Sequence, residues 1–444
     1  MIRLATLCVA GLLFVPAMAG ETVPSSEIVG GLPRKPLLGA AVGPAEGGLE
    51  VQGVGPGTAA EKMGLQPGDR LVSVDGQAVS DAASFVAAIA RKKTGETVKI
   101  AVRRGEESRT LEGALGPRPL EHQADYAVEY GSLEVPGGGG KRRTIVTRPK
   151  SAGKHPAVML IGGIGCYSLD GILRPAELQD AYAKLLDAWT RAGYVTMRVE
   201  KTGMGDSEGV ACADPKADFE LEARGYAAGL KALSDLDFVD GKRVFVFAHS
   251  IGPLVAARIV SERPVRALVV AETVGTSWFE YDLANVRRQL LLAGAPYDEV
   301  DRRVRHHEVC AHRFFVDMQS LEQLVAGDAT CAGEILAPQP STYMQQIGAL
   351  DLAPLWKKID APVLIFYGTA DFVTDDSQHQ YLRDMINAFH PGRATYVKID
   401  GMDHGLLLAG SQQAAFAGPG ESGPPPFATK VLDETLRFFQ GARS

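Results

Sequence analysis

Ser250 is the residue of this sequence best placed to act as a nucleophile. It stands in Ala-His-Ser-Ile-Gly, between an apolar run that ends at Ala248 and a stretch of small residues over 253–262. A serine at the apex of a strand–turn–helix unit exposes its hydroxyl, and the amide that follows points into the same pocket. Small residues are needed on both sides of such a turn, and Ala248 and Gly252 meet that need. Because a serine hydroxyl is a poor nucleophile on its own, the motif predicts a base and an acid elsewhere in the chain.

An acid and a histidine each follow a later apolar run. Asp371 closes the sequence Gly-Thr-Ala-Asp, and His404 lies in Asp-Gly-Met-Asp-His-Gly. A histidine can take the serine proton as general base, and an acid can fix the tautomer of the histidine. Asp375 and Asp403 compete for the role of acid, but the first lies deeper in its loop and the second lies beside the base. The sequence therefore predicts a triad of Ser250, Asp371 and His404.

A glycine-rich loop can supply the groups that stabilise negative charge during such a reaction. The apolar run 157–161 is followed by Gly162-Gly163-Ile164-Gly165. Glycines let a backbone approach a ligand closely, and an amide aimed at a developing oxyanion stabilises it. We therefore expect the amides of Ile164 and Ile251 to form an oxyanion hole. The alternative is that the glycines form only a tight turn.

Strand-like and helical stretches alternate through the part of the chain that carries these residues. Two strands, over 126–135 and 143–147, are expected to open it. Further apolar runs follow, separated by helical stretches: 157–161, 194–199, 244–247, 267–270, 363–367 and 395–399. This alternation predicts an α/β fold with a mainly parallel sheet covered on both faces. Active sites of such sheets lie beyond the carboxyl ends of the strands, where the triad and the glycine-rich loop fall.

Residues 120–444 resemble a serine hydrolase of the α/β-hydrolase fold, in the serine aminopeptidase and monoglyceride-lipase-like branch. The order Ser, Asp, His is that of this fold. The turn 203–209 is similar to the Gly-x-Gly-x-Ser-x-Gly turn of the branch, and 350–363 is similar to the lead into its acid strand. The sequence departs from the pattern at Ala248, where glycine is usual, and at Gly162, where histidine is usual. The resemblance implies acyl transfer to water through an acyl-serine intermediate.

The resemblance also implies a cap over the serine. A helical insertion of about 276–348 lies between two of the predicted strands, at the position where this fold carries its cap. The insertion contains several histidines whose spacing does not match a metal site, and we expect them on solvated helix faces: His306, His307 and His312.

Residues 37–116 resemble a PDZ domain. The segment Leu37-Leu38-Gly39-Ala40 is similar to the carboxylate-binding loop of that domain, and 66–76 is similar to its turn, strand and hairpin. An amphipathic helix is predicted over 81–93. The resemblance implies that a peptide adds as an extra strand beside this helix, with its terminal carboxylate on backbone amides. The alternative is that the module only packs on its neighbour.

The N-terminus has the features of a secretory signal peptide over 1–19. Arg3 supplies the positive end, 4–15 form a short apolar core, and Ala17-Met18-Ala19 is a small-x-small cleavage site. The apolar run is too short for a stable membrane span. The sequence therefore predicts a periplasmic or secreted protein.

The cysteines agree with export. Loss of the signal peptide removes Cys8 and leaves four cysteines, an even number that suggests two disulfides in an oxidising compartment. Cys166 follows the glycine-rich loop and Cys212 follows a later glycine-rich turn, so both lie at one rim of the predicted sheet. Cys310 and Cys331 lie in the cap insertion. We expect the pairs Cys166–Cys212 and Cys310–Cys331; four free thiols in a protein that is not exported are the alternative.

Charge and motifs together narrow the function. The net charge of −7 gives no support for nucleic-acid binding, and the basic cluster Lys141-Arg142-Arg143 is expected at a solvated strand edge. The sequence predicts an exported serine hydrolase that cleaves carboxylic esters without a metal or an organic cofactor. A peptidase or amidase of the serine aminopeptidase type is one alternative, and a non-catalytic peptide-binding protein on a hydrolase scaffold is another. Expected partners are a small ester or peptide substrate and a protein C-terminus at the PDZ-like module.

Overall fold

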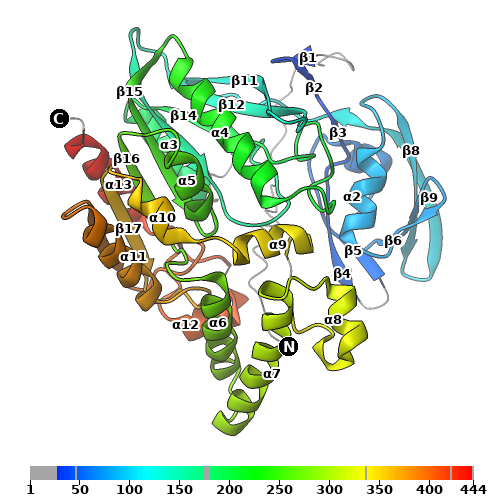
Figure 1. Ribbon diagram of the computed structural model, residues 1–444. Coiled ribbons are helices and arrows are strands. Elements are labelled where there is room, and N and C mark those ends of the chain that lie inside the picture. Colours follow the sequence, from blue (N-terminus) through cyan, green and yellow to red (C-terminus); the bar gives the residue numbers. More distant parts are fainter. Residues whose placement is uncertain (1–27, 46–47, 174–180, 336–337, 421–422, 443–444) are drawn as a thin grey trace.

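The computed structural model describes residues 28–442 except 46–47, 174–180, 336–337 and 421–422 (Figure 1). It contains one eight-stranded sheet, one smaller sheet and two short strand pairs. The predicted signal peptide over 1–19 lies outside the described residues. Within the described ranges, no helix is long and apolar enough to cross a membrane.

The larger sheet has the strand order β11-β12-β14-β13-β15-β16-β17-β18. Its strands are β11 (Tyr126–Glu134), β12 (Lys141–Pro149), β13 (His155–Ile161), β14 (Val195–Val199), β15 (Val239–His249), β16 (Ala267–Ala271), β17 (Val363–Gly368) and β18 (Ala394–Ile399). β12 pairs antiparallel with β11 and β14, and every pair from β14 to β18 is parallel. All residues of β14 and β16 are buried, as expected for parallel strands covered on both faces.

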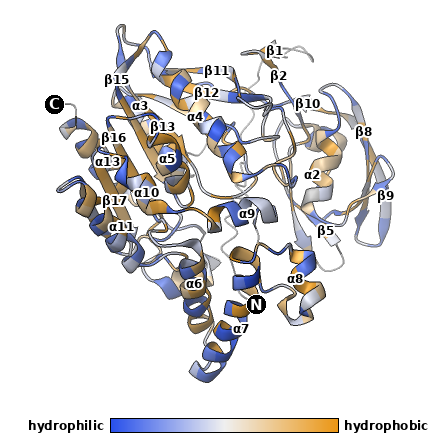
Figure 2. Cartoon of the chain, in the orientation of Figure 1, coloured by the Kyte–Doolittle hydropathy of each residue, from blue (hydrophilic) through white to orange (hydrophobic). Residues whose placement is uncertain are grey.

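Helices cover both faces of this sheet, so its apolar strands are enclosed (Figure 2). One face packs against α3 (Ala181–Arg191) and α13 (Thr429–Gly441). There the ring of Phe439 lies 4.4 Å from that of Phe245 and 6.4 Å from that of Trp189, between centroids. The other face packs against α4 (Phe219–Asp235), α5 (Gly252–Val260), α10 (Leu352–Lys357) and α11 (Asp376–Phe389). α12 (Gln412–Ala417) precedes the closing helix.

A helical segment lies between β16 and β17, over the range expected for the cap (Figure 1). It consists of α6 (Trp278–Leu292), α7 (Tyr297–Phe315), α8 (Leu321–Gly327), the 3₁₀ turn η1 (Ala329–Cys331) and α9 (Ser341–Gly348). A disulfide joins Cys310 to Cys331, the pair expected from the sequence. The expectation of solvated histidines is wrong for His307, which is 1% exposed. Its ring lies between Asp282 of α6 at 2.6 Å and Glu334, in the turn after η1, at 3.4 Å.

The smaller sheet has the strand order β4-β5-β6-β8-β9, with the short β7 beside β6. Its elements are β4 (Ala40–Ala45), β5 (Gly48–Val54), α1 (Ala59–Met63), β6 (Arg70–Val74), β7 (Gln77–Ala78), α2 (Ala82–Ala90), β8 (Thr97–Arg104) and β9 (Glu107–Ala114). Val51, Phe85 and Ile100 are among the buried residues of its own core. Among the described residues β4 pairs only with β5, so its other edge has no strand partner, and α2 contacts β4.

The chain enters and leaves this smaller domain at one point. β3 (Pro36–Leu37) pairs antiparallel with β10 (Gly116–Pro117). The preceding segment forms the small hairpin of β1 (Ile28–Val29) and β2 (Leu32–Pro33). The guanidinium of Arg143 donates to the carbonyls of Val29 and Leu32, so this hairpin is bound to the larger sheet.

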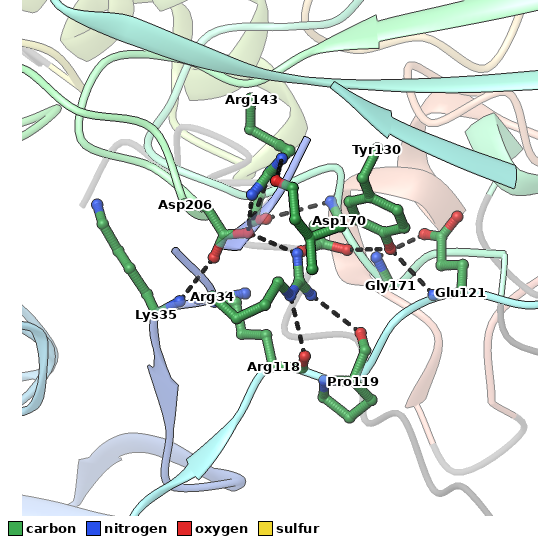
Figure 3. Close-up of polar contacts among 12 residues, drawn as sticks. Arg34, Lys35, Arg118, Pro119, Glu121, Tyr130, Arg143, Asp170, Gly171 and Asp206 are labelled. Atoms are coloured by element: carbon green, nitrogen blue, oxygen red, sulfur yellow. Dashed lines mark hydrogen bonds and ion pairs between the residues drawn. The ribbon is translucent and has the colours of Figure 1, made fainter. Parts of the chain in front are cut away.

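A buried ionic cluster fastens the same segment to the larger sheet (Figure 3). Nη1 of Arg34 lies 2.5 Å from Oδ2 of Asp206 and 2.8 Å from Oδ2 of Asp170. Arg143 in β12 reaches the same Asp206 oxygen at 2.9 Å. The expectation that 141–143 lie at a solvated strand edge is wrong for Arg142 and Arg143, which are 2% and 0% exposed. Asp206 balances the charge of Arg143 in this buried position.

Candidate active site

Four neighbouring strands of the larger sheet end at the same rim, and a polar residue follows each of them. After β15 comes Ser250, after β16 Glu272, after β17 Asp371 and after β18 His404. Because these strands are parallel and adjacent, their carboxyl ends lie side by side. The rim thereby brings together residues that are up to 154 positions apart in the sequence.

The turn at Ser250 is strained and tightly packed. Ser250 has a φ of +63°, in the left-handed region that side-chain-bearing residues adopt at a cost. Its amide donates to the carbonyl of Ala271 at 3.0 Å. A Cβ atom at Gly252 would lie 2.6 Å from the carbonyl oxygen of Ile161, so no larger residue fits without a shift of backbone. Ala248, which replaces the usual glycine, is fully buried and is accommodated.

The side chains of Ser250, His404 and Asp371 form a continuous hydrogen-bonded line. Nε2 of His404 lies 3.0 Å from Oγ of Ser250, and Nδ1 lies 2.9 Å from Oδ2 of Asp371. Asp371 is fully buried and also accepts hydrogen bonds from the amides of Val373 and Thr374. Burial alone would raise the pKa of Asp371, but the adjacent His404 and several hydrogen-bond donors hold it below its usual range. In this geometry the histidine can remove the serine proton while a charged carboxylate fixes its ring.

The two rival acids are engaged elsewhere. Asp375 lies 2.7 Å from Nη1 of Arg288 and caps α11. Oδ1 of Asp403 accepts a hydrogen bond from the amide of Leu407 in its own loop, at 2.9 Å. Of these three aspartates only Asp371 bonds the ring of His404 within the described residues.

The glycine-rich loop after β13 packs directly on the serine. A Cβ atom at Gly163 would lie 3.2 Å from Cβ of Ser250. Both sides of Gly163 are held, because its amide donates to Oη of Tyr182 at 3.1 Å and its carbonyl accepts from Nζ of Lys201 at 2.8 Å. The loop is therefore fixed in position beside the nucleophile.

The two amides expected to form the oxyanion hole are those of Ile164 and Ile251. One follows the glycine that packs on Ser250, and the other follows Ser250 itself. In the described part of the chain neither amide has a hydrogen-bond acceptor. A disulfide joins Cys166, close to Ile164, to Cys212 with their Cα atoms 5.6 Å apart, and this is the other pair expected from the sequence. The bridge restrains the loop that carries one of the two amides.

A buried chain of hydrogen bonds links this loop to the histidine, and the sequence analysis did not predict it. Oη of Tyr182 lies 2.6 Å from Nδ1 of His249, and Nε2 of His249 lies 2.7 Å from the carbonyl oxygen of His404. Burial lowers the pKa of His249 to about 3, so the ring is neutral. Its Nε2–H donates to that carbonyl, and its Nδ1 accepts from the Tyr182 hydroxyl. The only sequence signal was a histidine directly before the serine.

Two groups of three residues have metal-ligand atoms within 4.8 Å of one another in the described chain. The first is His306 with Cys310 and Cys331, but the sulfurs of these cysteines are joined in a disulfide and cannot serve as thiolate ligands. The second is Glu272 with Asp371 and His404, in which the histidine and the aspartate already bond each other. Neither group therefore offers a full set of ligands.

The larger domain has the architecture of an α/β-hydrolase, with the predicted serine, acid and histidine at its strand ends. Residues 174–409, more than half of the chain, match the family described as Serine aminopeptidase, S33, and residues 36–115 match the PDZ domain. The protein belongs to the serine aminopeptidase S33 family and carries a PDZ domain before its hydrolase domain. The fold class and the family resemblance predicted from the sequence are confirmed.

Two characterised relatives match parts of the chain. Esterase EstD of Thermotoga maritima is 22% identical over 304 residues, which are 66% of this chain and 64% of EstD. Magnetosome formation protease MamE of Paramagnetospirillum magneticum is 33% identical over 128 residues, which are 29% of this chain and 17% of MamE. The chain thus spans less than two thirds of either relative.

Similar solved structures include an esterase and a peptidase. Acetyl xylan esterase 1 from Thermoanaerobacterium sp. JW/SL YS485 is 16% identical with a TM-score of 0.45, over 74% of this chain and 87% of that one. Proline iminopeptidase of Mycobacterium smegmatis is 16% identical with a TM-score of 0.43, over 70% of this chain and 98% of that one.

Proposed function

We propose that the protein is an exported serine hydrolase that cleaves carboxylic esters through an acyl intermediate on Ser250. The observation that carries this proposal is the continuous hydrogen-bonded line from Ser250 through His404 to Asp371. His404 acts as general base and then as general acid, and Asp371 fixes its ring. The amides of Ile164 and Ile251 bind the oxyanion.

Each step of the proposed reaction moves one proton between named atoms. Nε2 of His404 takes the proton of Ser250 Oγ as this oxygen attacks the ester carbonyl carbon. The tetrahedral oxyanion is stabilised by the two amides, the bond to the alcohol oxygen breaks, and Nε2 gives its proton to that oxygen. A water molecule then loses a proton to Nε2 as it attacks the acyl carbon. The acid leaves and the proton returns to Oγ, which restores the enzyme.

Esters are the first choice of substrate, and peptide or amide bonds are the second. An alcohol leaves a tetrahedral intermediate more easily than an amine, so an ester demands less of the site, and EstD is an esterase by name. The family description, Serine aminopeptidase, and the PDZ domain favour the second choice. Both choices use the same acyl-Ser250 chemistry.

The PDZ domain is proposed to bind a protein C-terminus at Leu37, Leu38, Gly39 and Ala40. The carbonyl of Leu38 accepts a hydrogen bond from the amide of Ala60, and that of Gly39 accepts one from the amide of Gly55, each at 2.8 Å. These two oxygens therefore point into the domain. Gly39 has a φ of +86°, and a Cβ atom there would lie 2.3 Å from Cβ of Thr58. A loop whose carbonyls turn inward, beside the strand edge of β4, suits a carboxylate and an added peptide strand.

Export to the periplasm or the medium is proposed from the predicted signal peptide and the two disulfides. Disulfides form and persist in oxidising compartments. The bridged cysteines are 46 positions apart at Cys166–Cys212 and 21 positions apart at Cys310–Cys331. Peptide mapping of the protein from its native compartment without reduction should recover both pairs. Four alkylatable thiols would contradict export.

The experiment that tests the catalytic proposal is active-site labelling followed by a substrate panel. A fluorophosphonate should label Ser250 in the native protein and nothing in Ser250→Ala. Small p-nitrophenyl esters and aminoacyl amides should then be compared by kcat/KM, with faster turnover of the esters expected. Absence of labelling and of turnover in the folded protein would favour the alternative of a non-catalytic peptide-binding protein.

A further inference from the structure

Glu272 is a buried acid that the proposed mechanism does not use. It follows β16, the strand that lies between the strand leading to Ser250 and the strand leading to Asp371. Its side chain is fully buried, and one of its carboxyl oxygens lies within 4.8 Å of both an Asp371 oxygen and a ring nitrogen of His404. Glu272 is therefore the side chain next to the triad on the side of its acid.

Two features make glutamate an unfavourable residue at this position. Its backbone has a φ of +49°, in the left-handed region that favours glycine, and its amide donates to the carbonyl of Phe366 at 3.2 Å. Neither oxygen of its buried carboxyl receives a hydrogen bond of normal geometry from the described residues. The carboxyl instead faces the carboxyl of Asp371, with the backbone of Gly368 also close to it. A buried carboxyl that meets a second carboxyl is unfavourable unless one of them holds a proton, and residues with a strained backbone cluster at active sites.

The charges around Glu272 decide its protonation state. The titratable groups that face it come from the loops after β17 and β18, from these strands and from α11: Asp371, His404, Asp403, Tyr367, Tyr396 and His379. None of them is a lysine or an arginine. Burial lowers the pKa of His379 to about 4, so its ring carries no charge. Burial and the charge of Asp371 raise the pKa of Glu272 well above its usual value. A second carboxylate would have no counter-ion here, so Glu272 is the uncharged acid of the pair.

We propose that Glu272 is a positioning residue of the active site, whose carboxyl proton is directed at the Asp371 carboxylate and holds it in line with Nδ1 of His404. This inference rests on the proposed function of the same triad. It has a chemical consequence for the base. A donor on Asp371 spreads the negative charge of that carboxylate, so Asp371 orients the ring of His404 without binding the protonated ring too strongly. The base then stays available in more acidic solution.

Two substitutions of similar size separate this role from a purely structural one. Glu272→Gln keeps a hydrogen-bond donor and no charge, whereas Glu272→Leu removes the donor. We expect Glu272→Gln to keep kcat within about three-fold of the native value. In the pH profile of kcat/KM, the fall on the acid side (the acid limb) should stay at the native pH. Glu272→Leu should lower kcat by roughly ten-fold and move the acid limb to higher pH, because Asp371 then holds the protonated His404 more strongly.

Other outcomes would overturn the proposal. If Glu272 were ionised, Glu272→Gln would remove a negative charge and move the acid limb to lower pH. If the role were only structural, Glu272→Leu would lose activity with an unmoved acid limb. Native kinetics in Glu272→Leu would show that the residue has no role.

A spectroscopic readout is independent of turnover and still applies where Glu272→Leu does not fold. The infrared spectrum of the native protein at pH 7 should contain the band of a protonated carboxyl that is missing in Glu272→Gln. Identical spectra would contradict the proposal. Fluorophosphonate labelling of Ser250 in the native protein tests the proposed function separately, so a failure of that function is not mistaken for a failure of Glu272.

Discussion

The two sheets of the protein present their proposed functional sites in opposite ways. The larger sheet presents strand ends, where the side chains of Ser250, Asp371 and His404 converge from three loops. The smaller sheet presents the edge of β4 and a loop of backbone groups. Removal of one side-chain atom can stop catalysis at the first site, whereas a substitution in a groove made of backbone groups only weakens peptide binding. The two regions should therefore respond to substitution on very different scales.

The largest effect is expected at the nucleophile. Ser250→Ala should lower kcat for a small ester by roughly 10⁴-fold or more, because no other atom can form the acyl intermediate. Ser261→Ala, at the C-terminal end of α5, is a matched control that should keep native activity. A fluorophosphonate adduct on a different serine, or native turnover by Ser250→Ala, would refute the assignment.

A loss of similar or slightly smaller size is expected at the acid. Asp371→Asn should lower kcat by roughly 10³–10⁴-fold, because an amide stabilises the wrong tautomer of the histidine. Asp375→Asn, in the same loop but bound to Arg288, should keep most of the activity. Comparison of kcat for the two variants is the measurement. Equal losses would show that the shape of the loop matters rather than the charge of Asp371.

An intermediate effect is expected from His249, the buried histidine that precedes Ser250. This effect is on the stability of the protein. The folded protein holds the pKa of His249 at about 3, while an unfolded histidine titrates near about 6.5. Between these values the unfolded state binds more protons, so the free energy of unfolding should fall as the pH decreases from about 6.5 to about 3. Between pH 7.5 and pH 4.5, the free energy of unfolding should fall by roughly 2–3 kcal/mol less in His249→Gln than in the native protein. Urea unfolding at the two pH values gives this difference, and the same loss in both proteins would contradict it.

The smallest effect on hydrolysis is expected at the groove. Replacement of residues 37–116 by a short Gly-Ser linker, with Arg34 kept, should leave small-ester hydrolysis largely intact and abolish binding of C-terminal peptides. Gly39→Val in the full chain should weaken peptide binding alone, because a side chain there collides with Thr58. Fluorescence anisotropy of a labelled peptide and an ester assay measure the two properties. Loss of all ester hydrolysis in a folded truncation would mean that the PDZ domain completes the active site.

The parts of the molecule that the sequence predicts well are those that depend on local patterns. The parallel strands appear as apolar runs, and the triad was predicted because Ser250, Asp371 and His404 each follow such a run. Parallel order then brings the three strand ends together without further information. The boundaries of both domains and the chemical roles of these residues remain predictions.

The features that the sequence did not predict depend on partners far away along the chain. Arg143 is buried because Asp206 lies beside it, although 63 positions separate them. His307 is buried in the cap, where α6 brings Asp282 and the turn after η1 brings Glu334 to its ring. Glu272 lies two residues after the predicted strand 267–270, but its proposed role depends on the neighbouring strand that leads to Asp371. Burial of a charge is decided by its partner, and a single stretch of sequence does not contain that partner.

The pairing of β3 with β10 brings the two ends of the PDZ domain together. The chain enters the domain at 36–37 and leaves it at 116–117, and these two segments lie side by side. The contact of Arg34 with Asp206 lies outside these limits and fastens the junction from the hydrolase side. We therefore expect this junction to accept another binding domain with adjacent ends, with the path of the remaining chain unchanged. Under the proposed function, such chimaeras would bring the same hydrolase domain to different protein partners.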